Sequence, residues 1–348
     1  MKKKIKKSLL FLFSLLGLTQ LFFHLRFRKK NQILILLYHR VRISKNPFEI
    51  AVSPENFSVQ LEFLKKHFDV VSLREALRRK ENNRLSSKPL AVITFDDGYR
   101  DNFENAHPLL KKYSLPAVFF LTAGSIGNRA PMWTSRVEAL FKNTSQQDLA
   151  LATLSPPRRY KLGNFEKRMS VCFEVKNEMK KVPDERRRMI LEELEEKAGN
   201  LSLEKDEIAS EMLSWEEVRR LAKDPLVEIG SHSLSHRMLA HLSSEEVARE
   251  LEESKKMIEA EIGRAVNYFS YPGNSYNLEV KRLAQRAGYK GALAVDRSLC
   301  SFDEDNFALK RVHVEDGPLY FFQAEISLTL SILRSLLNLP KLGRGETQ

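Results

Sequence analysis

Six short runs of apolar residues, separated by amphipathic stretches, constrain the fold of this chain more than any other feature. They occupy residues 33–39, 91–95, 117–123, 226–232, 268–272 and 291–295. Several are apolar almost throughout, as expected of strands that are buried on both faces. Strands alternating with amphipathic helices are typical of β/α units around a parallel sheet or barrel. The sequence therefore predicts the α/β class, specifically a distorted (β/α) barrel over residues 31–317.

Start and stop signals support helices between these strands. Ser53-Pro54 precedes an amphipathic stretch, and Ser214 with Glu217 and Ser243 with Glu246 have the spacing of capping boxes. We assign these residues structural roles only.

Two segments depart from the alternation. Residues 133–213 are charged and helix-prone, which predicts a helical insertion that either caps a site or decorates the surface. Residues 318–348 contain an apolar stretch interrupted by Gln323, Glu325 and Arg334, and predict a C-terminal amphipathic helix and tail.

The first 30 residues form the clearest compositional break. Ser8 to Leu25 is apolar and flanked by lysines and arginines, and a helix over it would be about 27 Å long. That length barely spans a bilayer core of about 30 Å. We expect an uncleaved membrane anchor facing the cell envelope or the extracellular side, with a cleaved signal or a flat interfacial helix as alternatives. Basic residues flank both ends, so orientation stays open.

The overall charge of +12 and a pI near 9.5 suggest an anionic environment, either a membrane surface or nucleic acid. No zinc-finger spacing or RNA-binding aromatic motif is present, so nucleic acid is not an expected partner. Two cysteines are too few for a disulfide framework or a thiolate metal site.

Two polar motifs follow predicted strands. In "VITFDDGYRDN", Asp97-Gly98 fits a turn, but Asp96 is left without a structural explanation. In "EIGSHSLSHRML", His232 and His236 are four residues apart, and one helical turn would bring their imidazoles together.

Together these motifs predict a metal-dependent catalytic site. Two histidines and one carboxylate make three protein ligands and leave positions open for water, as in catalytic zinc sites. A second carboxylate beside them would accept a proton from that water. The C-terminal ends of barrel strands are where such folds build active sites.

On these residues the chain resembles the polysaccharide deacetylase family, carbohydrate esterase family 4, which also contains the chitooligosaccharide deacetylase homology domain of nodulation proteins. "TFDDGY" is similar to its first motif and "HSLSH" to its second. The resemblance implies Asp96 as general base and Asp97, His232 and His236 as ligands of one divalent ion. Zinc suits these ligands best, with cobalt, nickel or iron also compatible.

"YFSYPGNSYN" resembles the third family motif, which forms a groove wall. The resemblance implies that Phe269, Tyr271 and Pro272 contact substrate and that the Tyr271 backbone N–H stabilises the reaction's oxyanion. The family often continues with an aromatic residue and glycine, whereas Gly273-Asn274 follows here.

The acid that protonates the departing amine has two candidates. "LLYHRV" places His39 in an L-x-H motif, whereas His313 in "LKRVHV" lacks the leucine. Because the chain resembles the permuted poly-N-acetylglucosamine deacetylase branch, in which this motif comes first, His39 is preferred. Arg264 and Arg311 are candidates for orienting Asp96 or substrate.

The predicted function is metal-dependent removal of acetyl groups from N-acetylated sugars of a cell-envelope polysaccharide or a lipid-linked sugar. A lid-like insertion would suit a discrete acceptor better than a long polymer. One alternative is a catalytically silent glycan-binding barrel. Another metal hydrolase, such as a phosphodiesterase, would need a second set of carboxylate ligands, which the sequence does not offer.

Overall fold

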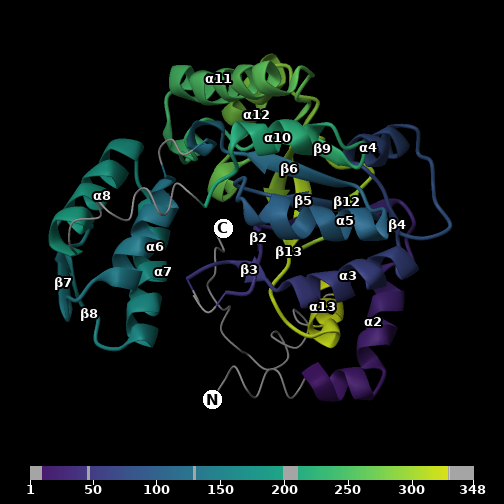
Figure 1. The fold of residues 1–348 in the computed structure, drawn as a ribbon, viewed down its shortest axis with the longest axis horizontal. Helices are drawn as coiled ribbons and strands as arrows, with labels where there is room; N and C mark the ends of the chain where they lie inside the picture. The colour runs from purple at the N-terminus through teal and green to yellow at the C-terminus, as the bar shows by residue number, and fades with distance from the viewer. Residues whose placement is uncertain (1–9, 45–47, 128–130, 199–210, 328, 330–348) are drawn as a thin grey trace.

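Seven parallel strands close into a barrel in the computed structural model, which describes residues 10–44, 48–127, 131–198, 211–327 and 329 (Figure 1). Around the ring the strands are β1 (Gln32–Tyr38), β13 (Leu309–His313), β11 (Gly291–Val295), β10 (Tyr268–Ser270), β9 (Val227–Ser231), β6 (Ala117–Leu121) and β5 (Leu90–Phe95). Strand β1 pairs with β5 from Ile33↔Leu90 to Tyr38↔Phe95 and completes the closure. The predicted barrel is confirmed.

Six of these strands coincide with the six apolar runs. The seventh, β13, was not among the predicted strands, although it separates β1 from β11 in the ring. Short strands extend the sheet at its edges: β4 (Asp69–Val70) pairs with β5, and β12 (Cys300–Ser301) pairs antiparallel with β1. A separate pair consists of β2 (Arg40–Val41) and β3 (Ala51–Val52).

Alternate residues of the strands enter two different cores, because successive side chains point to opposite faces. One set, which includes Leu34, Leu36 and Ile93, packs beneath the outer helices. The other set, which includes Ile33 and Val92, fills the barrel interior. Burial on both faces explains why these strands are apolar throughout.

Helices cover the outside of the barrel (Figure 1). They are α3 (Pro54–His67), α4 (Leu73–Glu81), α5 (His107–Tyr113), α10 (Trp215–Ala222), α11 (Ser244–Ile262) and α12 (Leu278–Arg286). Both predicted capping boxes are present, at the start of α10 and of α11. Short turns of other helix types also occur: η1 (Asn102–Ala106), η2 (Ala123–Ser125), η3 (Leu239–His241) and η4 (Pro272–Asn274).

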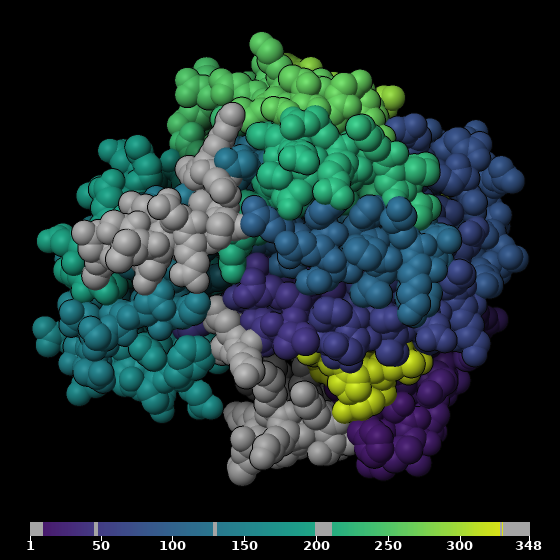
Figure 2. Space-filling model, viewed as in Figure 1, coloured from purple at the N-terminus to yellow at the C-terminus, as the bar shows by residue number. Residues whose placement is uncertain are grey.

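The insertion is a lobe with its own hydrophobic core, which includes Val137, Leu149, Val175 and Ile190. It contains α6 (Trp133–Asn143), β7 (Asp148–Leu151), β8 (Arg158–Lys161), α7 (Phe165–Lys181) and α8 (Asp184–Ala198). The antiparallel β7–β8 pair was not predicted by the helical reading of this segment. The teal lobe stands beside the barrel in Figures 1 and 2.

The N-terminal segment does not form the single helix predicted over residues 8–25. Residues 10–15 are helical, Gly17 adopts a φ of +71°, and α2 (Leu18–Arg26) follows. No helix among the described residues has both the length and the apolar character needed to cross a membrane. Phe23 of α2 packs edge-on against Phe63 and Phe68.

Part of the predicted C-terminal helix is observed as α13 (Leu319–Ile326), which packs against α2 and α3 (Figure 1). After α13, residues 327 and 329 are described, whereas residues 328 and 330–348 of the predicted segment lie outside the described residues.

Candidate active site

The two aspartates lie where β5 ends, in a turn with unusual backbone geometry. Asp97 has a φ of +77° and Gly98 a φ of +89°, a region that non-glycine residues rarely adopt. A Cβ on Gly98 would lie 2.9 Å from the Ile126 side chain, so a larger residue would require rearrangement. The backbone carbonyls of Asp97 and Gly98 accept hydrogen bonds from Thr122 and Leu213, at 3.2 and 3.0 Å. The turn therefore fixes the direction of both carboxylates.

The two histidines lie in the loop after β9, not on the helical turn that their spacing predicted. His232 continues the strand direction, because its N–H donates to the Leu121 carbonyl at 2.8 Å. His236 has a φ of +58°, and its N–H donates to Ser233 Oγ at 3.0 Å. A folded loop, rather than helical periodicity, brings the imidazoles together.

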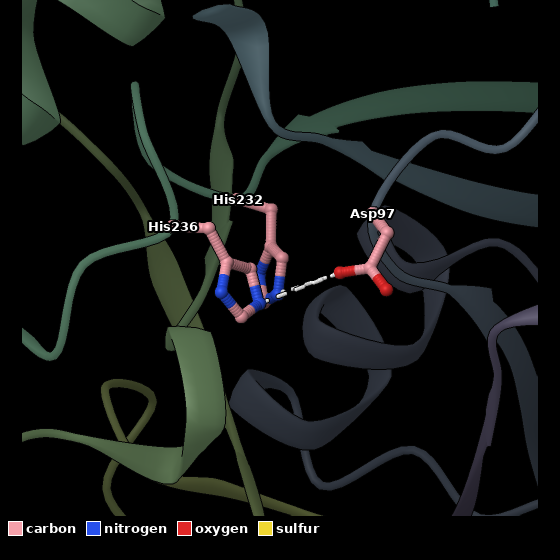
Figure 3. A group of neighbouring side chains, drawn as sticks. All are labelled: Asp97, His232 and His236. Atoms are coloured by element: carbon pink, nitrogen blue, oxygen red, sulfur yellow. Dashed lines mark ion pairs between the residues drawn. The ribbon is translucent and has the colours of Figure 1, made fainter. Parts of the chain in front are cut away.

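Asp97 and the two histidines converge on one point (Figure 3). The Asp97 Oδ1 atom lies 3.4 Å from His232 Nε2 and 3.5 Å from His236 Nε2. One ligand atom from each residue lies within 4.8 Å of the others, and all three residues are buried. His232 Nδ1–H donates to the Ser270 carbonyl at 2.8 Å, which leaves Nε2 with its lone pair directed at the group.

The donor set fits a divalent ion. Asp97 Oδ1 is buried and accepts no hydrogen bond from the described residues. Burial, reinforced by the charge of Asp96, raises the pKa of Asp97 to about 8, so a cation would be needed to keep it ionised at neutral pH. Burial also lowers the pKa of His232 and His236, which favours the neutral imidazoles that bind metals.

Asp96 is held by Arg311 from inside the barrel. Arg311 is fully buried, and its Nη1 and Nη2 donate to the two Asp96 oxygens at 2.8 and 2.7 Å. Ser270 Oγ donates to Asp96 Oδ2 at 3.0 Å. Three of roughly four acceptor positions of the carboxylate are thereby used, which leaves one for water. Burial alone would raise the pKa of Asp96, but the Arg311 charge holds it well below its usual range.

The two candidate acids lie together at neighbouring strand ends. His39 follows β1 and His313 ends β13, and their ring centroids are 5.5 Å apart. Both residues line the same cavity as Asp96 and Asp97. Burial lowers the pKa of His39 to about 4, although the Asp96 charge acts in the opposite direction. His39 is therefore neutral at neutral pH before a reaction starts.

The residues of the third motif differ in position. Tyr271 lines the cavity, whereas Phe269 is fully buried in the outer core against Tyr271 and Tyr289, and Pro272 is buried outside the cavity lining. Phe269 and Pro272 therefore do not line this cavity, and their contact with substrate stays a prediction. The Tyr271 N–H already donates to the Leu293 carbonyl at 3.1 Å, so the structure does not leave it free for an oxyanion.

Arg264 is not part of the site. Its Nη2 donates to the carbonyl of Val227, the first residue of β9, at 2.9 Å. The active-site histidines follow the other end of that strand. The proposal that Arg264 orients Asp96 is therefore wrong.

The insertion contributes a wall of the cavity, whose volume is about 230 Å³. Its cavity-lining residues come from α6 and α7 and include Glu138, Lys142, Phe173, Lys176 and Lys180. Sequence reasoning did not single out these residues. The spacing of Phe173, Lys176 and Lys180 along one helix face was the available signal.

The insertion also contacts the loop that carries His236. Trp133 Nε1 donates to the His236 carbonyl at 3.0 Å. The Arg187 guanidinium carbon lies over the Trp133 ring, 5.0 Å from the ring centroid. Arg237, the next residue along, donates to Asp184 at the start of α8 at 2.9 Å. The first residues of α6 and α8 therefore both hold the loop that carries His236.

Comparisons with known proteins identify a family that this chain matches. The family model described as polysaccharide deacetylase matches residues 83–292. The Bacillus subtilis (strain 168) protein YxkH is 21% identical over 290 residues, covering 83% of this chain and 74% of that protein. The poly-β-1,6-N-acetyl-D-glucosamine N-deacetylase of Staphylococcus aureus (strain N315) is 34% identical over 113 residues, covering 28% of this chain and 39% of that enzyme.

Solved structures share the fold. IcaB from Ammonifex degensii has a TM-score of 0.54 at 17% identity, covering 85% of this chain and 97% of that one. The Streptococcus pyogenes deacetylase PplD, solved in complex with acetate, has a TM-score of 0.50 at 19% identity. The match covers 82% of this chain and 94% of that one.

Proposed function

This chain belongs to the polysaccharide deacetylase family, and from that premise we propose that it is a metal-dependent hydrolase removing acetyl groups from N-acetylated sugars. The observation that carries the proposal is that two adjacent carboxylates have different partners. Asp97 points at two histidines, whereas Asp96 is held separately by Arg311. A site that only bound glycan would not need an ionised second carboxylate beside a metal group.

Asp97, His232 and His236 would hold the ion, most suitably zinc, with cobalt, nickel or iron as alternatives. When bound, it would polarise the acetyl carbonyl and acidify a water molecule. Asp96 would orient that water and accept its proton at the acceptor position that Arg311 and Ser270 leave open. Arg311 would keep Asp96 ionised and pointing inward.

His39 would deliver the proton to the departing nitrogen. Its imidazole starts neutral, since burial lowers the pKa of His39 to about 4, so it must gain a proton during turnover before donating one. The neighbouring His313 is the alternative donor, with a ring centroid 5.5 Å away. Transfer leaves a free amine on the sugar and releases acetate.

The proposed substrate is a cell-envelope glycan or a lipid-linked sugar. One support is the similarity of 113 residues to the poly-β-1,6-N-acetyl-D-glucosamine N-deacetylase of Staphylococcus aureus (strain N315). A further support is the cavity of about 230 Å³, below the range of about 300–1,000 Å³ typical of drug-sized ligands. A cavity of this size suits one sugar residue at a time.

We further propose that the N-terminal segment attaches the protein to a membrane on the cell-envelope or extracellular side. Leu12, Leu15 and Leu16 are 48%, 67% and 64% exposed, an unusual exposure for adjacent leucines. Arg28, Lys29 and Lys30 follow and would attract anionic lipid headgroups.

The test compares wild-type protein with Asp96→Asn on N-acetylglucosamine oligomers with β-1,6 and β-1,4 linkages. Acetate release and bound metal are measured on the same samples. The proposal predicts that the variant keeps its metal and its fold but loses acetate release by about 100-fold or more. If wild type and Asp96→Asn bind the glycan with equal affinity and wild type releases no acetate, the silent glycan-binding barrel would be favoured.

A further inference from the structure

The charges that line the cavity do not balance once their partners are assigned. Each lining carboxylate already has a cationic partner or belongs to the metal group. The pairs are Asp96 with Arg311, Glu138 with Lys176, Glu211 with Arg40 and Arg42, and Glu49 with Arg42. The remaining lining carboxylate, Asp97, faces the two histidines.

Lys180 has no such partner. It lies on α7, lines the cavity, and forms no hydrogen bond or ion pair with any residue in the described part of the chain. Its Cε lies 3.9 Å from the position that a Cβ would take on Gly273, so the side chain reaches the loop beside Tyr271. The ammonium group is therefore near the third-motif wall rather than on the outer surface of the lobe.

Lys180 is also electrostatically close to the reacting groups. Its positive charge contributes to lowering the pKa of both His39 and His236. Burial, together with the charge of Lys176, lowers the pKa of Lys180 itself to about 8. The charges of Glu138 and Asp97 act in the opposite direction, but neither carboxylate contacts the Lys180 ammonium group. A desolvated ammonium group without a contacting carboxylate is unfavourable, and a bound anion would relieve the cost.

A second lysine extends this positive charge toward solvent. Lys142 on α6 lines the same cavity, is exposed, and has no carboxylate partner among the described residues. The helices that carry both lysines lie on the side of the lobe that faces the barrel (Figure 1). The wall that the insertion contributes therefore carries two lysines, of which Lys142 is the more exposed.

We propose that Lys180, supported by Lys142, binds an anionic group of the sugar substrate, either a phosphate or a carboxylate, on or next to the sugar that carries the acetyl group. The inference rests on the proposed deacetylase function and narrows its substrate class. The insertion is then a specificity element, because it supplies both lysines. A neutral polymer would leave Lys180 uncompensated.

The test measures binding to the zinc-loaded full chain by titration calorimetry, using three sugars. These are N-acetylglucosamine 1-phosphate, N-acetylmuramic acid as the carboxylate, and the neutral methyl N-acetylglucosaminide. The variants are Lys180→Met, which keeps the stem, and Lys180→Arg, which keeps the charge. The matched control is Lys181→Met on the same helix, where Lys181 is 62% exposed and lies 3.3 Å from Glu178.

The proposal predicts that wild type binds one of the anionic sugars about 10- to 100-fold more tightly than the neutral sugar. That preference should fall at least fivefold in Lys180→Met and persist in Lys180→Arg and Lys181→Met. Which anionic sugar shows it identifies phosphate or carboxylate. A metal ion attracts anions in every variant, so a preference that survives in Lys180→Met would overturn the proposal. No preference, or no binding of any sugar by wild type, would also overturn it.

Acetate release from the same three sugars tests the underlying function separately. A Lys180-dependent preference without acetate release would support the anion site while removing the deacetylase proposal. Acetate release with equal efficiency from neutral and anionic sugars would retain the deacetylase and reject the anion site.

Discussion

The indole N–H of Trp133 donates a hydrogen bond of 3.0 Å to the backbone carbonyl of His236, a residue of the metal group. Trp133 is the first residue of the insertion, and His236 is 103 positions later. His236 adopts a positive φ, which is costly for a residue with a Cβ. The bond therefore helps to hold a strained loop in the conformation that directs the imidazole at Asp97.

Trp133→Phe should weaken metal binding while keeping the fold. The substitution removes the N–H and retains an aromatic ring beneath Arg187, so we expect a loss of about 10-fold in metal affinity, as for other groups that orient ligands. Competition with a chromophoric chelator measures this loss. Trp215→Phe is the matched control, because the Trp215 Nε1 has no hydrogen-bond partner in the described residues. Equal metal affinity in both variants would show that Trp133 does not position the ligand.

Arg311→Met should destabilise the protein by about 3–5 kcal/mol, because it leaves the buried Asp96 carboxylate without its ion pair. Chemical denaturation of wild type and variant measures the change in the free energy of unfolding. Arg264→Met, which removes one hydrogen bond to a backbone carbonyl, should cost less than about 1.5 kcal/mol.

A double-mutant cycle isolates the pair. If the cost comes from the uncompensated carboxylate, Asp96→Asn in the Arg311→Met background should recover part of the lost stability. Additive costs of the two substitutions would mean that Arg311 contributes through packing rather than through Asp96.

The lowered pKa of His39 should be detectable in the pH dependence of the free energy of unfolding. Its pKa is about 4 in the folded protein and near 6.5 when unfolded, so the unfolded state binds more protons between these values. Neutral, buried His39 therefore has its full stabilising effect above about pH 6.5. As the pH falls toward 4, the free energy of unfolding decreases by up to ~3 kcal/mol on account of this residue. Metal-free His39→Gln should therefore lose less stability over this range than metal-free wild type. Parallel curves would contradict the lowered pKa.

Membrane attachment should depend on the exposed leucines. The double substitution Leu15→Glu, Leu16→Glu should abolish flotation of the full chain with vesicles that contain anionic lipid, since buried apolar area drives interfacial binding. Leu278→Glu is the control, because Leu278 is 59% exposed on α12. Unchanged flotation of the double variant would reject this surface as the attachment site.

The barrel was predictable because strands buried on both faces must be apolar throughout. Strand β13 does not meet that criterion, because only Leu309 and Val312 of its five residues are apolar. Arg311 is buried inside the barrel only because Asp96, 215 positions away, receives its guanidinium. Such a pair depends on tertiary contact and has no local sequence signal.

Parts of the site were predictable for a different reason. The residue types of Asp97, His232 and His236, and their positions after predicted strands, were enough to predict that they form one site. The helical turn predicted for the histidines is instead a loop, in which Ser233 and His236 have positive φ. Strand alternation could have indicated that Ser270 faces the barrel interior and Phe269 faces the helices. The N-terminal helix is interrupted because Gly17 adopts a left-handed conformation.

The most direct test of the central claim is the metal content of the full chain by elemental mass spectrometry, with wild type, the double variant His232→Ala, His236→Ala, and Asp96→Asn compared after zinc loading and desalting. The account predicts about one divalent ion per chain in wild type and in Asp96→Asn, and none in the folded double variant. A wild-type protein without metal, or a double variant that retains it, would contradict the proposed metal centre.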